Sequence, residues 1–252
     1  MGSSRAGGVP TTLPTDAAPR HQQTTLAVDR SCGERLDIAP GVIVVSGWLT
    51  PDDQQMIVER FRQWARPPAG LRHPRMPRGH LMSVQSVCLG WHWQPYRYSR
   101  TADDTDGTQV KPLPRVIAQL GRRAIADTFG ASAAGEFDPD AVIANLYAPG
   151  ARLGLHQDAE EPSPAPVVTI SVGDTCVFRI AGVDRRTSPF IDVPLQSGDL
   201  LVFGGPSRRI YHGVPKVYDN TGPCIPGLPP GRLSLTIRQT GLADEPPPTL
   251  DT

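Results

Sequence analysis

The 252-residue chain has no apolar run of about 18 residues, the shortest that suits a membrane-spanning helix. Its N-terminus also lacks the apolar segment of a secretory signal. The four cysteines are widely separated and form no Cys-x-x-Cys pair, which argues against a disulfide framework or a zinc site. Formal net charge is zero. These absences predict a cytoplasmic protein with no membrane partner.

Proline (28) and glycine (25) are abundant, which favours short strands joined by turns over a helix-rich architecture. One helix is predicted over residues 51–65 with Thr50 as its N-cap, and a second from Pro114 to a stop at Gly130. Strands are predicted over residues 41–46, 81–89, 141–148, 152–157, 166–172, 175–181, 190–195, 199–204, 209–214 and 232–240. Two helices before about eight strands predict a mainly β protein with flanking helices (α+β), built as an antiparallel double sheet.

His156, Asp158 and His212 form a candidate metal site. Residues i and i+2 of a strand point the same way, so His156 and Asp158 can reach one ion from one strand. Two imidazoles and a carboxylate are the ligands of non-haem Fe(II) oxygenases, and they leave three coordination positions open. The other interpretation is a solvated loop over residues 157–161 beside a core histidine.

The predicted last strand carries polar residues on one face only, at Arg232, Ser234, Thr236 and Arg238. Two arginines on an enclosed face need anions, and a dicarboxylate supplies two. Asn145 and Tyr147 share a face of an earlier strand and could bond the same ligand. The alternatives are an edge strand with a solvated face and a tyrosine that only packs.

Residues 60–80 contain six arginines, two histidines and no acid. A confined basic segment on a neutral protein suits contact with a polyanion, although a solvated arginine-rich loop would look the same.

Several segments in order resemble the AlkB family of Fe(II)/2-oxoglutarate dioxygenases, and its bacterial alkylation-repair members most. The resemblance covers roughly residues 40–240 and rests on Asn145–Ala151 with Leu155–Asp158, then on Gly198–Gly205, Arg209–Val214 and Arg232–Arg238. Met82–Val84 and Leu89–Trp91 resemble the family's upstream nucleotide-recognition segment.

The resemblance implies specific roles for residues of this chain. Fe(II) would be bound by His156, Asp158 and His212. The cosubstrate 2-oxoglutarate would be bound by Asn145, Tyr147, Arg232, Ser234 and Arg238, with O2 as the oxidant. The nucleotide would be contacted by Trp91, Tyr96, Tyr98, Glu160, Arg152, Met82 and Ser83.

The implied fold is a double-stranded β-helix, or jelly-roll. Residues 1–38 would be a disordered leader, 39–110 a nucleotide-recognition segment with the first helix, 111–242 the catalytic core with its preceding helix, and 243–252 a disordered tail. The implied activity is oxidative demethylation of N1-methyladenine and N3-methylcytosine in DNA, and also in RNA, on a single-stranded or flipped base, by a monomer. A tailoring oxygenase of a free nucleotide or other small metabolite is the alternative.

The chain departs from the family pattern at one position that bears on a cosubstrate hydrogen bond, Ser234, and at positions of the nucleotide-recognition segment that bear on substrate choice. Ser234 stands where related members have Asn, and His80 replaces a usual Tyr. The spacing from Trp91 to Tyr96 is two residues short, and the loop over residues 215–231 is longer than usual.

Overall fold

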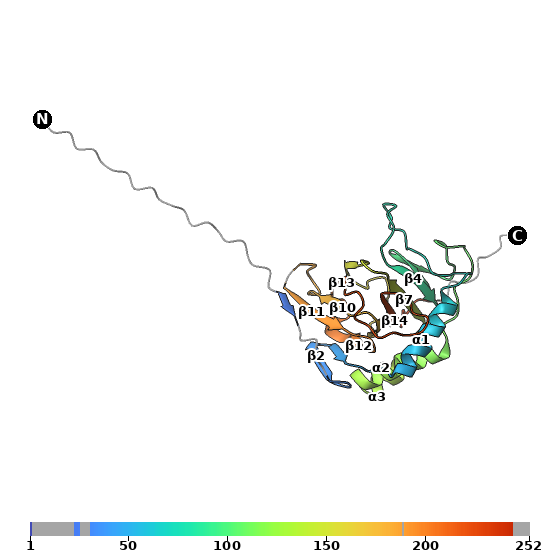
Figure 1. Cartoon of the computed structure of the whole chain (residues 1–252), viewed down its shortest axis with the longest axis horizontal. Coiled ribbons are helices and arrows are strands. Elements are labelled where there is room, and N and C mark those ends of the chain that lie inside the picture. Colours follow the sequence, from blue (N-terminus) through green and yellow to red (C-terminus); the bar gives the residue numbers. More distant parts are fainter. Residues whose placement is uncertain (2–22, 26–30, 188, 244–252) are drawn as a thin grey trace.

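The computed structural model describes residues 1, 23–25, 31–187 and 189–243, and two β-sheets form its centre (Figure 1). The larger sheet has seven strands in the order β2 (Arg35–Ala39), β3 (Val42–Val45), β12 (Leu200–Phe203), β9 (Val167–Gly173), β14 (Arg232–Arg238), β7 (Ala141–Tyr147) and β4 (Gln85–Leu89). The smaller sheet has the order β1 (Gln23–Thr25), β11 (Phe190–Leu195), β10 (Cys176–Ile180), β13 (His212–Val217) and β8 (Leu153–His156). Pairing is antiparallel except between β1 and β11, as in a jelly-roll.

Two long helices, α1 (Pro51–Trp64) and α2 (Arg115–Phe129), cover the outer face of the larger sheet. Thr50 begins α1 as predicted, because its side chain accepts a hydrogen bond from the Asp53 amide at 3.1 Å. Apolar residues of both helices, such as Ile57 and Ile125, pack with outward-facing strand residues into one core. A second core fills the space between the sheets.

Strand β14 shows how the sequence places a polar pocket inside an apolar protein. Leu233, Leu235 and Ile237 join the core under the helices, while the alternate polar residues face the space between the sheets. All seven residues of the strand are buried. The alternation predicted from the sequence therefore encloses both arginines rather than exposing them at an edge.

The structure corrects several expectations. A short helix α3 (Ala131–Glu136) directly follows Gly130, whose φ of 93° lets the chain turn after α2 ends. Within the expected leader, 35–38 belong to β2 and 23–25 form β1, while 2–22 and 26–30 lie outside the described residues. Most of the expected tail, 244–252, also lies outside them.

The expected division at residue 110 does not separate two sheets. β3 and β4, both N-terminal to that point, pair with β12 and β7 of the larger sheet. What does stand apart is a hairpin of β5 (His92–Gln94) and β6 (Arg97–Ser99), which forms its own two-stranded sheet. No helix of the described residues is both long and apolar enough to cross a membrane.

Candidate metal and cosubstrate site

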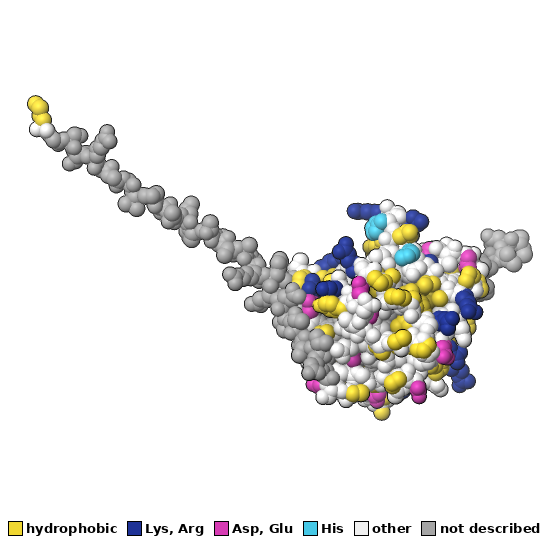
Figure 2. Space-filling model, in the orientation of Figure 1, with side chains coloured by type: hydrophobic (Ala, Val, Ile, Leu, Met, Phe, Trp, Pro, Cys, Tyr) yellow, Lys and Arg dark blue, Asp and Glu magenta, His cyan; other side chains and the backbone are white. Residues whose placement is uncertain are grey.

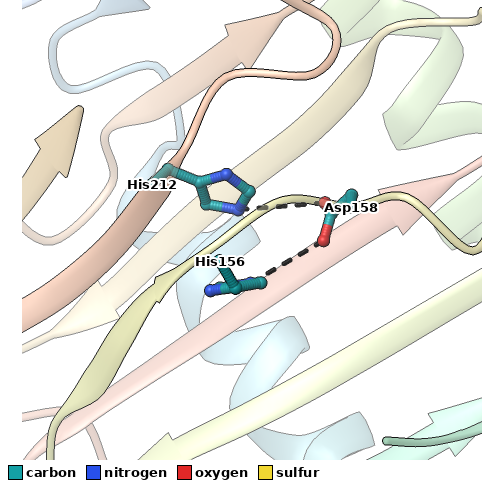
Figure 3. A group of neighbouring side chains, drawn as sticks. All are labelled: His156, Asp158 and His212. Carbon is teal, nitrogen blue, oxygen red and sulfur yellow. Dashed lines mark ion pairs between the residues drawn. The ribbon is translucent and has the colours of Figure 1, made fainter. Parts of the chain in front are cut away.

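His156, Asp158 and His212 converge at one end of the smaller sheet (Figure 3). His156 ends β8 and His212 begins β13, and the antiparallel register pairs these two residues directly. Asp158 follows His156 by two positions. One carboxylate oxygen lies 3.7 Å from Nε2 of His156 and the other 3.8 Å from Nε2 of His212. The three potential ligand atoms all lie within 4.8 Å of one another, so one ion could contact all of them.

Backbone contacts orient both imidazoles for metal binding. Nδ1 of His156 lies 3.0 Å from the Gly154 carbonyl, and Nδ1 of His212 lies 3.1 Å from the Ile210 carbonyl. A carbonyl can only accept, so each Nδ1 donates its hydrogen and each Nε2 keeps its lone pair. Dashed lines in Figure 3 mark the ion pairs that join the two Nε2 atoms to the Asp158 carboxylate.

The electrostatics suit a bound cation. Burial lowers the pKa of His212 to about 4, helped by the neighbouring His156, so the imidazole is neutral at ordinary pH. Burial would raise the pKa of the Asp158 carboxyl, but Arg238 and the two imidazoles hold that pKa well below its usual range. One oxygen of Asp158, Oδ2, is buried with no hydrogen-bond partner among the described residues. A neutral imidazole, an ionised carboxylate and an unpaired buried oxygen fit Fe(II).

Arg232 lies in the same pocket and is 0% exposed. Its Nη2 donates to Ser171 Oγ at 2.8 Å and to Ser234 Oγ at 3.2 Å. Its Nε and Nη1 have no hydrogen-bond partner among the described residues. A buried guanidinium with two unused donors is costly unless an anion completes it, so these donors fit a carboxylate of 2-oxoglutarate.

Arg238 is paired differently, because carboxylates of the protein already surround it. Its Nη2 lies 2.8 Å from Asp158 Oδ1, and its Nη1 lies 2.5 Å from Glu161 Oε1 and 2.7 Å from the Tyr98 hydroxyl. Its Nε has no partner among the described residues. Arg238 therefore connects the metal ligand Asp158 to a second buried carboxylate.

Asn145, Tyr147 and Ser234 all line this pocket, as expected for cosubstrate residues. The register of β7 and β14 pairs Asn145 with Ser234 and Tyr147 with Arg232. Asn145 Oδ1 accepts from Ser86 Oγ at 2.6 Å, which leaves its amide nitrogen for a ligand. Burial raises the pKa of Tyr147 to about 12, so its hydroxyl keeps its proton as a donor. A shorter Ser at 234 still reaches Arg232.

The residues expected to contact a nucleotide are less closely gathered. Trp91 is only 4% exposed, and the Arg100 guanidinium lies 3.6 Å from the centre of its ring. Arg100 therefore covers one face of the ring. Tyr96 is 68% exposed at the turn between β5 and β6. Tyr98 instead points inward, where its hydroxyl donates to Glu161 Oε1 at 2.5 Å.

The remaining expected nucleotide residues lie near the start of β8 and in the loop after it. Ser83 Oγ contacts the backbone of Arg152 at 2.9 Å and 3.1 Å, which ties residues before β4 to the segment that leads into β8. The Arg152 side chain is exposed, and Met82 and Glu160 are half-buried. None of these four lines the pocket of Arg232.

Sequence reasoning missed Glu161 and Arg208, both buried beside the metal ligands. Glu161 Oε2 accepts from Arg208 Nη2 at 3.2 Å, and Arg208 Nη1 also donates to the Asp158 carbonyl at 3.1 Å. The available signal was a pair of adjacent acids, Glu160 and Glu161, followed by a pair of arginines before His212. Which member of each pair turns inward depends on loop geometry that no periodic pattern encodes.

Comparison with known families identifies the fold and the family. Residues 41–238 match the family model described as the 2OG-Fe(II) oxygenase superfamily. A solved structure described as that of OsALKBH1 superposes with a TM-score of 0.72 at 33% identity, covering 82% of this chain and all of that one.

Curated relatives are named as dioxygenases of the same family. An alpha-ketoglutarate-dependent dioxygenase AlkB homolog of Caulobacter vibrioides is 36% identical, over 82% of this chain and 91% of its own length. AlkB of Escherichia coli is 39% identical, over 66% of this chain and 75% of its own length. A DNA N(6)-methyladenine demethylase of Arabidopsis thaliana, ALKBH1D, is 34% identical over 80% of this chain, which spans about half (50%) of that relative. This family implies Fe(II) as the cofactor and 2-oxoglutarate and O2 as the cosubstrates. The chain therefore belongs to the 2OG-Fe(II) oxygenase superfamily, as an AlkB-type member.

Proposed function

We propose that the protein is an oxidative demethylase of alkylated bases in nucleic acid, with N1-methyladenine and N3-methylcytosine as its substrates. One observation carries the proposal: the His156–Asp158–His212 cluster opens onto the pocket in which buried Arg232 has two unused donors. Relatives named as AlkB dioxygenases and as DNA N(6)-methyladenine demethylases support nucleic acid as the substrate. They do not favour the alternative of a tailoring oxygenase.

In this proposal, one group of residues binds the metal and another binds the cosubstrate. With 2-oxoglutarate and O2, bound Fe(II) supplies the oxidation that converts an N-methyl group into an N-hydroxymethyl group, which then releases formaldehyde. His156, Asp158 and His212 would hold the ion on one face. Arg232 would pair with the distal carboxylate of 2-oxoglutarate, while Arg238, Asn145 and Tyr147 would orient its metal-proximal end.

The substrate side is assigned from side-chain chemistry. N1-methyladenine and N3-methylcytosine are cations, so the ring of Trp91 and the carboxylate of Glu160 would favour them. The base must leave its stack to reach the metal, which is cheaper for a damaged or single-stranded base. We propose DNA as the main substrate and RNA as a further one, acted on by a cytoplasmic monomer.

A basic hairpin is the proposed contact for the sugar-phosphate backbone. Residues 73–82 fold back on themselves, with Met76 N bonded to His80 O at 2.9 Å and Met82 N to Pro74 O at 2.9 Å. This segment projects from the top of the molecule in Figure 1, and Figure 2 shows Arg and His side chains gathered there. The exposed basic residues are His73, Arg75, Arg78 and His80. Arg72, by contrast, is buried and paired with Asp104 at 3.0 Å, so the basic run is not one surface.

Replacing Arg78 with Ala is expected to weaken binding of a single-stranded oligonucleotide roughly threefold to fivefold near physiological salt. One lost phosphate contact should also lower the slope of log affinity against log salt by about 0.7. Fluorescence anisotropy at several salt concentrations measures both quantities. Arg115→Ala is the matched control, because Arg115 is also exposed but lies on α2. Equal slopes for the two variants would remove the hairpin from the interface.

The deciding experiment compares substrates directly. The protein, with Fe(II), 2-oxoglutarate and O2, is given an N1-methyladenine oligonucleotide or the corresponding methylated mononucleotide, and loss of the methyl mass is followed. Demethylation of the oligonucleotide at a far higher kcat/KM is the expected result. If neither that oligonucleotide nor one with N3-methylcytosine is demethylated while a free nucleotide is oxidised, the proposed function is wrong.

A further inference from the structure

Glu161 is a fully buried carboxylate that binds no metal in the proposed mechanism. It is 0% exposed and accepts hydrogen bonds from three side chains. Oε1 accepts from Tyr98 at 2.5 Å and from Arg238 at 2.5 Å, and Oε2 accepts from Arg208 at 3.2 Å. A buried carboxylate with this many charged and polar partners is a fixed junction, because breaking any one contact leaves a group unpaired in a dry interior.

The junction balances the charge around the metal ligand. Two buried carboxylates, Asp158 and Glu161, face two buried guanidiniums, Arg208 and Arg238. Without the Glu161 charge, both guanidiniums would be left with Asp158 as their only acid within this group. Arg238 would then lose the contact that holds it between Asp158 and Tyr98. The side chain of Glu161 therefore sets where the Arg238 guanidinium lies.

Tyr98 extends the junction to the hairpin of β5 and β6. That hairpin belongs to neither large sheet. Within β6, the side chains of Arg97 and Ser99 bond to nearby residues, Asp103 and Thr101. The Tyr98 hydroxyl instead reaches Glu161 and Arg238, 63 and 140 positions away in the sequence. The tip of the same hairpin carries the exposed Tyr96, which we assign to the nucleotide.

We infer that Glu161 is a positioning residue that couples the cosubstrate pocket to the β5–β6 hairpin through Arg238 and Tyr98. A carboxylate of the cosubstrate that meets Arg238 restricts its guanidinium, and the shared contact with Glu161 then restricts the Tyr98 hydroxyl. Binding of the cosubstrate in the pocket therefore restricts the motion of the β5–β6 hairpin. Coupling between binding sites is reciprocal, so a ligand on the hairpin strengthens cosubstrate binding by the same factor. The inference rests on the proposed function only for the identity of that ligand.

Amide hydrogen exchange over residues 92–99 tests the coupling without catalysis or nucleic acid. The full chain is measured with Mn(II) alone and with Mn(II) plus N-oxalylglycine, an unreactive dicarboxylate analogue of 2-oxoglutarate. In the parent protein, the analogue is expected to slow exchange of the hairpin amides roughly tenfold, the effect of fixing one charged hydrogen bond. Tyr98→Phe and Glu161→Gln should each remove most of this slowing, although both still bind the analogue in a calorimetric titration.

The double variant identifies the route. If Tyr98 acts through Glu161, combining Tyr98→Phe with Glu161→Gln should remove no more of the slowing than either change alone. Tyr218→Phe and Glu59→Gln are the matched controls, since each makes the same chemical change on an exposed or partly exposed side chain away from the junction, and both should keep the full slowing. Should Glu161→Gln fail to fold, Tyr98→Phe decides alone, because it removes a single oxygen.

Two results would overturn the coupling: no slowing in the parent protein when the analogue binds, or full slowing in Tyr98→Phe. Either result is independent of the demethylation assay, because no nucleic acid is present. Conversely, a protein that oxidises only a free nucleotide would lose the proposed function and could still show the coupling.

Discussion

Replacing His156, Asp158 or His212 with Ala is expected to abolish 2-oxoglutarate turnover in each case. Two ligands cannot hold the ion on the face that the three residues define, and the loss should exceed roughly a thousandfold. The fold should survive the two histidine changes, because both Nδ1 atoms bond only to backbone carbonyls two residues away. Asp158→Ala removes one partner of Arg238, whose second carboxylate partner, Glu161, remains.

Succinate formation measures turnover, and circular dichroism with thermal melting checks the fold. Calorimetric titration with Mn(II) gives a readout that does not depend on catalysis, and all three variants should lose tight binding. Glu136→Ala is the control, because the Glu136 side chain is exposed on helix α3, outside the candidate site. Near-normal succinate production by any of the three variants would exclude that residue from the ligand set.

The sequence predicted the metal and cosubstrate pocket because regular strands build it. Two-residue periodicity placed Arg232 and Arg238 on one face of β14, and their burial follows from the covering sheet. The same periodicity put Asn145 and Tyr147 on one face of β7, where both line the pocket. Resemblance to a family then supplied the identity of the ligands. Periodicity alone favoured an exposed strand edge.

Features outside regular strands could not be predicted in the same way. Glu161 lies in the irregular segment after β8, where no period says which of two adjacent acids turns inward. The burial of Trp91 under Arg100 depends on the path of the chain around the β5–β6 hairpin. Helix α3 has six residues and buries none of them, so it leaves no apolar stripe in the sequence. Strand β2 is a five-residue edge strand that follows a stretch rich in Gly, Pro, Thr and Ala, so composition placed most of it in the leader.

Arg232→Lys is expected to raise the KM for 2-oxoglutarate roughly tenfold to a hundredfold, with a smaller change in kcat. Lysine keeps the charge but replaces a two-donor fork with a point charge, so one charge-assisted hydrogen bond is lost. A contact that the cosubstrate makes equally before and during reaction affects KM more than kcat. Both constants come from succinate formation over a range of 2-oxoglutarate concentrations. Arg35→Lys, on strand β2 and partly exposed, is the control and should leave KM unchanged.

Of the two arginines expected to bind 2-oxoglutarate, Arg232 gives the clearer test, because two of its donors have no partner among the described residues. Removing the Arg238 side chain leaves Asp158 and Glu161 without their shared guanidinium, which should cost about 3–5 kcal/mol of stability and would confuse binding with folding. Among the described residues, the Arg232 guanidinium donates its hydrogen bonds to two hydroxyls, at Ser171 and Ser234, so replacing it leaves no buried carboxylate unpaired. An unchanged KM in Arg232→Lys, with the melting temperature preserved, would mean that the distal carboxylate binds elsewhere. A raised KM in Arg232→Lys, together with a similarly raised KM of the parent protein for a shorter 2-oxo dicarboxylate, would place the distal carboxylate on the two free donors of Arg232.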